Sequence, residues 1–326
     1  MDGHLLLIIF LLSTKNFGLS EAKMNTTMNA IWTSGTEPQY GQTIRQFSSK
    51  NVWIRVSYAG LCRTDILCGK GILQAETNRI LGHEFSGVVV YSPDERIKTG
   101  DRVVVNPVMR CGRCHGCHRN RPCMDVLFLG KDLDGAFADF IEVPPEAVYT
   151  IPDSLSLLDA AYTEPVAASM SVLEVGLDPS MEGVVIGKGR IAQLTLEVLQ
   201  IHGFTQTILL GEPINGVQFD FAIETRMDFD IEPVLRMLYP EGICVLKCRR
   251  PTKAHFPAEL LVKNSLHIRG ANTIAFEKAI AFLGSGQLNL NPYIGPIVPL
   301  GQFIPKFELG ESQKAFCQPH HFPEGL

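Results

Sequence analysis

The chain has 326 residues, more than a single hydrophobic core usually supports, so two domains are expected. Hydrophobic residues make up 45% and charged residues 19% of the sequence, a balance that excludes wholesale disorder and is typical of a globular protein. The net charge of -5 is spread along the chain without a long run of Lys or Arg, which argues against nucleic acid as a partner.

An apolar run at residues 5–12 is the one feature that suggests a targeting segment. It is preceded by an Asp and by no Lys or Arg, and it is well short of the roughly 18 to 20 residues that span a bilayer. We therefore expect neither secretion nor a membrane partner. Residues 1–27 are interpreted as an N-terminal extension, with Met24 and Met28 as alternative translation starts.

Short apolar segments separated by Gly, Pro and polar clusters follow, and they predict a compact, mostly β domain over residues 28–155. The predicted strands are residues 28–32, 52–58, 85–91, 102–105 and 137–143. Residues 156–175 contain longer stretches that are compatible with helices.

From Gly183 onward, strands and helices alternate, which predicts a parallel α/β sheet within a second domain of residues 156–288. The expected strands are residues 183–187, 207–210, 219–224, 242–247 and 264–269, and the expected helices are residues 190–202, 231–238 and 276–283. The last segment, residues 289–326, is rich in Pro and Gly and is expected to pack back on the first domain.

Four of the nine cysteines lie within thirteen residues, at Cys111, Cys114, Cys117 and Cys123. Four thiolates at this spacing match a closed, tetrahedral structural zinc site better than a disulfide framework, so we expect a reducing, cytoplasmic location. The alternative is four unrelated thiols. His115 and His118 lie between these cysteines and are interpreted as solvated bystanders of a complete four-Cys set.

A second group of candidate metal ligands lies upstream, where Cys62 is followed by His83 and Glu84. One thiolate, one imidazole and one carboxylate can hold a catalytic zinc that keeps a position open for water or substrate. Taken alone, these residues have ordinary alternatives, because a single Cys is usually a core residue and a His-Glu pair is usually a surface pair.

Several short motifs occur together in one order along the chain, and only their combination is specific. They are Gly60 to Asp65, Gly82-His83-Glu84-Phe85, Gly100-Asp101-Arg102-Val103, the four-Cys group, Asp134 to Phe140 and Thr163-Glu164-Pro165. From about residue 28 to residue 316, the chain resembles the medium-chain zinc-dependent dehydrogenases. It is most similar to the polyol, threonine and aminocyclitol dehydrogenase branch, which has a Glu-Pro pair at this place.

The resemblance implies an α/β architecture with a GroES-like domain that carries the metals and a Rossmann domain that carries NAD or NADP. A small-molecule alcohol would bind in the cleft between the domains, and many relatives are homo-oligomers. Cys62 and His83 would bind the catalytic zinc, and Glu84 would be a third ligand or a close neighbour. Glu164 would hold the zinc-bound water or complete the coordination. Asp65 would orient His83, and Thr64 would relay a proton.

The cofactor would bind at the turn Gly187-Lys-Gly189-Arg190-Ile191-Ala192, which follows a strand and opens a helix. Lys188 and Arg190 add positive charge near the place expected for the pyrophosphate. The alternative is an ordinary strand-to-helix turn. Glu212, one residue beyond the position expected for a ribose-binding acid, would favour NAD because a carboxylate repels a 2′-phosphate.

The sequence departs from the family pattern in three places. Leu67 occupies the position where many relatives have a His that takes part in the proton relay. Five residues separate Cys117 from Cys123, where the family usually has seven. Between Pro213 and Phe219 the chain lacks about one α/β unit, whose strand would be the third of the Rossmann sheet, at one edge.

We therefore predict a zinc-dependent oxidoreductase that transfers hydride between a secondary alcohol and a nicotinamide cofactor. The alternative is a catalytically silent zinc protein with a binding or structural role, and a zinc-free quinone reductase is disfavoured by the metal ligands. Of the remaining cysteines, Cys68, Cys244 and Cys248 are interpreted as packed thiols. Cys317, His320 and His321 are expected in an exposed, mobile tail.

Overall fold

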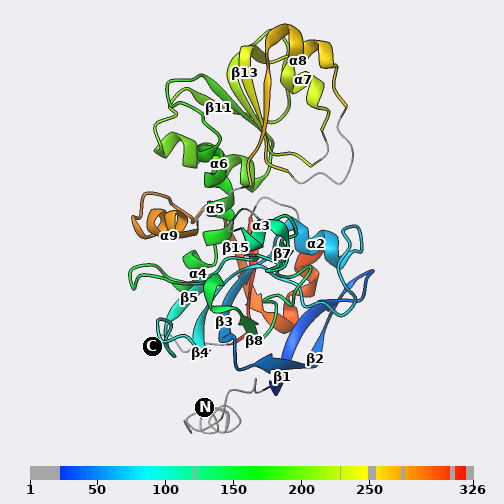
Figure 1. Cartoon of the computed structure of the whole chain (residues 1–326), viewed down its shortest axis with the longest axis vertical. Helices are drawn as coiled ribbons and strands as arrows, with labels where there is room; N and C mark the ends of the chain where they lie inside the picture. The colour runs from blue at the N-terminus through cyan, green and yellow to red at the C-terminus, as the bar shows by residue number, and fades with distance from the viewer. Residues whose placement is uncertain are drawn as a thin grey trace. The chain divides into compact units, whose positions relative to one another are not determined.

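The computed structural model describes residues 23–119, 121, 123–227, 229–248, 255–272, 276–308 and 313–320. These residues divide into two compact units, which are coloured along the chain in Figure 1. The first unit contains the described residues up to Ala161 together with residues 296–308 and 315–320. The second contains those from Tyr162 to Gly295 together with residues 313–314.

The first unit is built around antiparallel strands. A hairpin of β1 (Lys23–Thr33) and β2 (Pro38–Ser48) accompanies a sheet with the order β15-β16-β3-β4-β5-β9, in which β8 also pairs with β3. These strands are β3 (Val52–Gly60), β4 (Glu84–Tyr91), β5 (Arg102–Val105), β8 (Phe140–Val143), β9 (Val148–Thr150), β15 (Ile294–Pro299) and β16 (Lys314–Gln318). The segments between these strands contain a short strand pair and three helices. The pair is β6 (Val108–Met109) with β7 (Leu127–Phe128), and the helices are α2 (Arg63–Gly69), α3 (His115–His118) and α4 (Leu157–Ala160).

Aromatic side chains from the end of the chain complete the core of the first unit. Phe303 is the residue between two short helical turns, η3 (Leu300–Gln302) and η4 (Ile304–Glu308), and Phe307 lies in η4. Both side chains are buried. Their ring centroids lie 5.1 Å and 6.1 Å from that of the buried Phe137. The C-terminal segment is therefore part of this core.

One expectation for this segment is wrong. Cys317 is completely buried in β16, where it pairs with Ala59 of β3, so it does not lie in an exposed tail. Side chains on one face of a strand recur every second residue, so Ala315 and Cys317 point to the same face of β16. Both belong to the apolar core of the first unit, which explains the burial of Cys317. His320 is partly exposed, and His321 lies outside the described residues.

The second unit contains a five-stranded parallel sheet with the order β11-β10-β12-β13-β14. The strands are β10 (Gly183–Ile186), β11 (Thr207–Leu210), β12 (Phe219–Glu224), β13 (Leu238–Leu246) and β14 (His267–Gly270). The helices are α5 (Thr163–Met170), α6 (Arg190–Ile201), α7 (Ile231–Leu235), α8 (Ala258–Asn264) and α9 (Phe276–Gly284), and the turn η2 (Ser171–Glu174) follows α5.

Both faces of this sheet are covered, which explains why its strands are nearly continuous apolar runs. Val185 and Ile223 belong to an apolar cluster with Leu199 of α6, whereas Val184 belongs to a separate cluster with Val234 of α7. The order of the strands is that of a Rossmann sheet without the third strand at one edge, so the predicted fold class is confirmed. In the described part of the chain, every helix is too short or too polar to cross a bilayer.

Elements with little apolar patterning differ from the sequence-based expectations. β2 is mostly polar and α8 has no buried residue, and neither was expected. The helix expected at residues 231–238 ends at Leu235, because Leu238 already pairs with Phe219 as the first residue of β13. The strand expected at residues 264–269 begins only at His267, as β14, because residue 264 is still the last residue of α8.

The contribution of the C-terminal segment to the core is testable with Phe303→Ala. Removing this completely buried ring leaves a cavity between Phe137 and Phe307, so we expect a loss of about 3 to 5 kcal/mol in the free energy of unfolding. Ile44→Ala, at a side chain that is 62% exposed, should change it by less than about 0.5 kcal/mol. Denaturant titration of both variants measures the difference, and equal small effects would contradict the packing.

Candidate functional site

The first group of candidate ligands is brought together by strand pairing. Cys62 caps the start of α2 just after β3, and His83 and Glu84 lie at the start of β4. Because β3 and β4 are antiparallel and Gly60 pairs with Glu84, the end of one strand lies beside the start of the next. The ligand atoms of Cys62, His83 and Glu84 all lie within 4.8 Å of one another, and the last two side chains are buried.

Asp65 connects the two segments that supply these ligands. Its Oδ2 accepts a hydrogen bond from the backbone N–H of Cys62 at 3.0 Å, and its Oδ1 accepts one from the backbone N–H of Gly82 at 3.0 Å. The same Oδ1 lies 3.1 Å from Nδ1 of His83. A carboxylate only accepts, so Nδ1 carries a proton, and in the neutral ring the lone pair lies on Nε2, where a metal can bind. The role predicted for Asp65 as an orienting residue agrees with this geometry.

The surroundings of His83 favour positive charge. Burial by itself would lower the pKa of His83, but the Asp65 carboxylate and the Cys62 thiol raise that pKa well above its usual value. Groups that stabilise an imidazolium also stabilise a bound cation at the same place. A donor set of sulfur, nitrogen and oxygen in an anionic pocket fits zinc.

The loop of the motif that begins at Asp134, which is distant in the sequence, fixes the backbone just before His83. The backbone N–H groups of Ala136 and Phe137 donate to the carbonyls of Gly82 and Leu81, at 2.9 Å and 2.8 Å. A Cβ at Gly135 would lie 2.1 Å from the Gly82 carbonyl oxygen, so this approach requires glycine.

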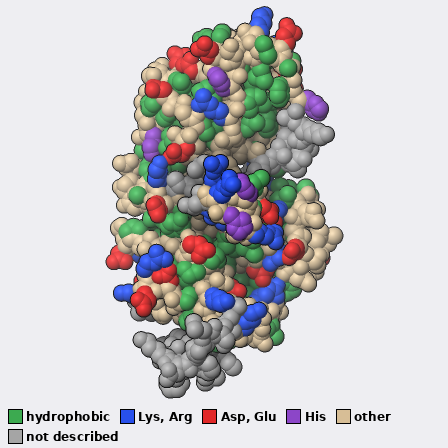
Figure 2. All heavy atoms as spheres, viewed as in Figure 1, with side chains coloured by type: hydrophobic (Ala, Val, Ile, Leu, Met, Phe, Trp, Pro, Cys, Tyr) green, Lys and Arg blue, Asp and Glu red, His purple; other side chains and the backbone are tan. Residues whose placement is uncertain are grey.

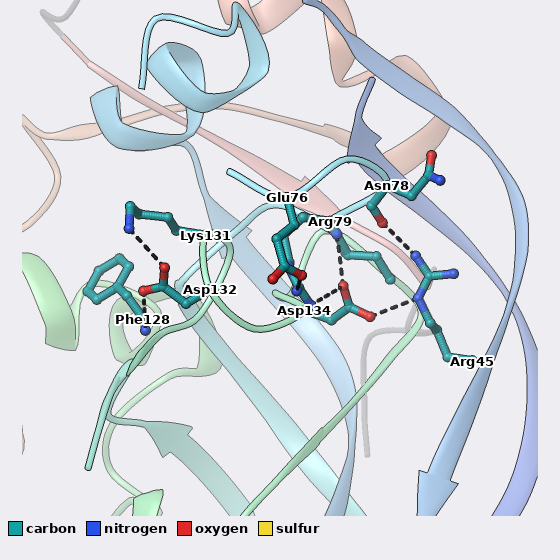
Figure 3. Close-up of polar contacts among 9 residues, drawn as sticks. Arg45, Glu76, Asn78, Arg79, Phe128, Lys131, Asp132 and Asp134 are labelled. Carbon is teal, nitrogen blue, oxygen red and sulfur yellow. Dashed lines mark hydrogen bonds and ion pairs between the residues drawn. The ribbon is translucent and has the colours of Figure 1, made fainter. Parts of the chain in front are cut away.

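Charged side chains hold that loop in place, as Figure 3 shows. Asp134 lies between two arginines: its Oδ2 accepts from Nε of Arg45 at 2.7 Å, and its Oδ1 accepts from Nη1 of Arg79 at 3.3 Å. Oδ1 also accepts from the backbone N–H of Ile80 at 3.1 Å. Asp132 accepts from the Lys131 ammonium at 2.8 Å. The predicted motif thus serves to position the backbone just before His83 and β4.

The four clustered cysteines form a second group of ligands. Four of their sulfur–sulfur distances are 3.6 Å (Cys114–Cys117), 3.6 Å (Cys111–Cys123), 3.8 Å (Cys114–Cys123) and 3.9 Å (Cys111–Cys117). A tetrahedron with Zn–S bonds of about 2.3 Å has edges of about 3.8 Å. The sulfurs are too far apart for disulfides, whose bond length is about 2.05 Å. The short loop between Cys117 and Cys123 therefore still allows four sulfurs to face one ion.

Backbone groups stabilise the thiolate form of Cys114 in this cluster. The N–H groups of Met124 and Cys117 point at Sγ of Cys114 at 3.3 Å and 3.4 Å, and they lower its pKa to about 5. His115 and His118 are both exposed on α3. In Figure 2, Lys, Arg and His side chains gather on the face over the place where Figure 1 shows α3.

In the second unit, the predicted dinucleotide turn follows β10 and opens α6. Gly187 has φ of +147°, and a Cβ there would lie 2.2 Å from Oγ1 of Thr225 and 3.1 Å from Cβ of Ala192. The first glycine and the small third residue are therefore required by close packing. Gly189 caps α6 without a side-chain hydrogen bond, and Arg190 and Ile191 begin the helix. The backbone N–H groups at the start of a helix suit a phosphate group.

Glu212, the candidate ribose-binding residue, is not alone at the end of β11. One of its oxygens pairs with Arg226, and the other lies 3.5 Å from Nζ of Lys188. Arg226 also binds the completely buried Glu224. The sequence did not indicate Arg226, because its partners are set by the order of the strands.

Glu164 and Thr64 lie in different units. Thr64 is partly buried on α2 of the first unit, and Glu164 begins α5 of the second. Lys247, another residue that the sequence did not indicate, lies just after β13, and its ammonium donates to the carbonyl of Ala168. Burial lowers the pKa of Lys247 to about 8, and Glu164 partly offsets this effect.

Comparisons with known proteins agree with this geometry. Residues 48–153 match the family described as alcohol dehydrogenase GroES-like domain. This stretch is an alcohol dehydrogenase GroES-like domain. The resemblance of the chain to the medium-chain dehydrogenases is thereby confirmed.

Two curated relatives and one solved structure extend the likeness. The chain is 26% identical over 318 residues to 2-dehydro-3-deoxy-L-galactonate 5-dehydrogenase of Pseudoalteromonas atlantica, covering 85% of this chain and 90% of the relative. It is 35% identical over 162 residues to sorbitol dehydrogenase of Bacillus subtilis, covering 47% of this chain and 46% of that protein, about half of each. An alcohol dehydrogenase of Escherichia coli CFT073, solved with NADH, has the same fold, with a TM-score of 0.78 and 22% identity over 90% of this chain and 99% of that chain.

The orienting role of Asp65 is testable with Asp65→Asn. Both Asp65 oxygens accept N–H groups, and an amide can replace only one of them, so the His83 imidazole should lose its fixed position. We expect zinc affinity at this site to fall roughly 10- to 100-fold. Competition with a chelator measures it, with Asp94→Asn, at a carboxylate paired with Arg96, as the control. Equal zinc affinity in the two variants would refute the role.

The four-Cys site makes a separate prediction for Cys114→Ser. Loss of one thiolate from a closed tetrahedral set should lower bound zinc from about two ions per chain to about one. Elemental analysis of the purified protein measures this content. Cys248→Ser is the matched control, because the Cys248 thiol donates to the Thr225 carbonyl and a hydroxyl can replace it. Unchanged zinc in Cys114→Ser would rule out the site.

Proposed function

We propose that the chain is a zinc-dependent oxidoreductase that transfers hydride between a secondary alcohol and a nicotinamide cofactor. The convergence of Cys62, His83 and Glu84, with Asp65 directing Nε2 of His83 toward them, is the observation that supports this most. The named activities of the relatives indicate a polyol, sugar-derived or amino alcohol as the substrate class.

The ligand set that we propose for the catalytic zinc is Cys62, His83 and a carboxylate, either Glu84 or Glu164. When bound there, zinc supplies a Lewis acid that lowers the pKa of a substrate hydroxyl. Cys62 and His83 fix the place of the ion through backbone contacts to Asp65, so the substrate oxygen is oriented by the first unit.

Thr64 is proposed to accept the substrate's hydroxyl proton at Oγ1 and to pass its own proton onward. Position 67, one turn further along α2, is Leu, which cannot carry a proton. The next carrier is then water or a hydroxyl of the cofactor ribose. This departure predicts a slower proton relay than in a dehydrogenase with His at that position.

For the nicotinamide cofactor, we propose binding at Gly187, Gly189 and the start of α6, with Glu212 accepting from the adenosine ribose hydroxyls. NAD is the expected cofactor. Arg226 and Lys188 offset the charge of Glu212, so its repulsion of a 2′-phosphate is weakened and the preference over NADP should be modest. The clustered thiols favour a cytoplasmic location, and homo-oligomerisation stays a prediction from the resemblance.

A catalytically silent zinc protein is the second candidate, favoured by the shortened sheet and by Leu67. Cys62→Ser separates the two functions. It should abolish reduction of NAD by a panel of polyols and amino alcohols, followed by absorbance at 340 nm, while NADH binding stays within about twofold, because the cofactor turn lies in the other unit.

Cys244→Ser provides the matched control for turnover, since this thiol is buried in β13 and is given no chemical role. If the wild-type protein binds two zinc ions but neither NADH nor NADPH, the silent candidate is correct and the oxidoreductase proposal fails.

A further inference from the structure

Four charged side chains form a connected group at the edge of the parallel sheet where the strands have their carboxyl ends, in the second unit. Arg226 binds Glu224 through Nε at 3.0 Å and through Nη2 at 2.7 Å. Its remaining nitrogen, Nη1, donates to Glu212, which also faces Lys188. We call this group the edge ion network.

The strand order places this network across the end of β10. Glu212 follows β11 and Arg226 follows β12, and β10 lies between these two strands in the sheet. In a parallel sheet, the carboxyl ends of all strands lie at one edge. The bond between Glu212 and Arg226 therefore spans the end of β10, where the turn at Gly187 begins.

Arg226 is anchored, whereas its partner Glu212 is not. Glu224 is completely buried and holds Nε and Nη2 of Arg226, whose side chain is 16% exposed. Glu212 is 57% exposed and Lys188 is 74% exposed. Nη1 is thus a fixed cationic donor whose present partner can move into water at little cost.

We propose that Arg226 binds the diphosphate of the cofactor, and that Nη1 exchanges Glu212 for a phosphate oxygen when the nucleotide arrives. The inference rests on the proposed function, since the turn at Gly187 is where a dinucleotide's diphosphate would lie. The exchange releases the Glu212 carboxylate, which then accepts from the ribose hydroxyls. One bond between two side chains is replaced by two bonds to the ligand.

The experiment compares a probe with a diphosphate to one without. ADP-ribose and adenosine compete with NADH fluorescence, which gives a dissociation constant for each. Arg226→Gln alone leaves Glu224 buried without its cation, so it is combined with Glu224→Gln. We expect this double variant to bind ADP-ribose roughly 10- to 100-fold more weakly, as for loss of a hydrogen bond to a charged group, and adenosine within about threefold.

The matched control is Arg236→Gln, which removes one positive charge from the same unit. Arg236 is exposed and follows α7, and it pairs with the partly exposed Glu232. It leads into the start of β13, so it lies toward the amino ends of the strands. Its dissociation constants should stay within about twofold of wild type, because an exposed pair contributes little. Thermal unfolding of each variant checks that the sheet is intact.

Glu212→Gln tests the exchange without touching the anchor. With 2′,3′-dideoxyadenosine diphosphate, which has no ribose diol, removal of the competing carboxylate should tighten binding about two- to fivefold. Unchanged affinity would overturn the exchange. The role of Arg226 would be overturned if the double variant lost affinity for ADP-ribose and adenosine equally, or kept its affinity for ADP-ribose. NADH binding by the wild-type protein would then still support the proposed function. A wild-type protein that binds no nucleotide would overturn both.

Discussion

The hydrogen bonds of the Asp65 carboxylate are the constraint on which the candidate catalytic site depends. A buried carboxylate is costly unless its oxygens are paired, and Asp65 satisfies them with two backbone N–H groups and the ring of His83. Those donors come from the two segments that carry Cys62 and His83. The positions of the ligands are therefore fixed by the peptide backbone, and the ion pairs of Asp134 with Arg45 and Arg79 extend this support to the surface.

The two candidate metal sites differ in how much of each was predictable. The four cysteines lie in one short loop, so their spacing alone indicated a tetrahedral site. Cys62 and His83 are brought together by pairing of β3 with β4, a long-range event, and only the resemblance to a family favoured them over ordinary core or surface residues. Regular, apolar elements such as β10 and β11 were predicted to within one residue of their bounds, because buried strands have a strong signal. Arg226, Lys247 and the burial of Cys317 were missed, since they depend on which strands are neighbours.

The shortened sheet of the second unit remains a complete folding unit because the missing strand belongs to an edge. β10, β12 and β13 keep neighbours on both sides, and apolar clusters cover both faces. The loss makes β11 the edge strand and leaves Ile208 46% exposed. The carboxyl end of β10, where the glycine turn and the edge ion network lie, has the same neighbours on both sides as it would in the longer sheet. We therefore expect the deletion to affect the adenosine side of the proposed cofactor site more than the diphosphate side.

The cost of the buried polar cluster bears on the choice between an enzyme and a silent zinc protein. Asp65, His83 and Glu84 are each at most 2% exposed, and a well-packed apolar set of similar volume is often as stable as buried charges or more stable. A scaffold gains nothing from the arrangement that leaves Nε2 of His83 beside Cys62 and a carboxylate. The ion with an open position that we propose for this site would offset its cost.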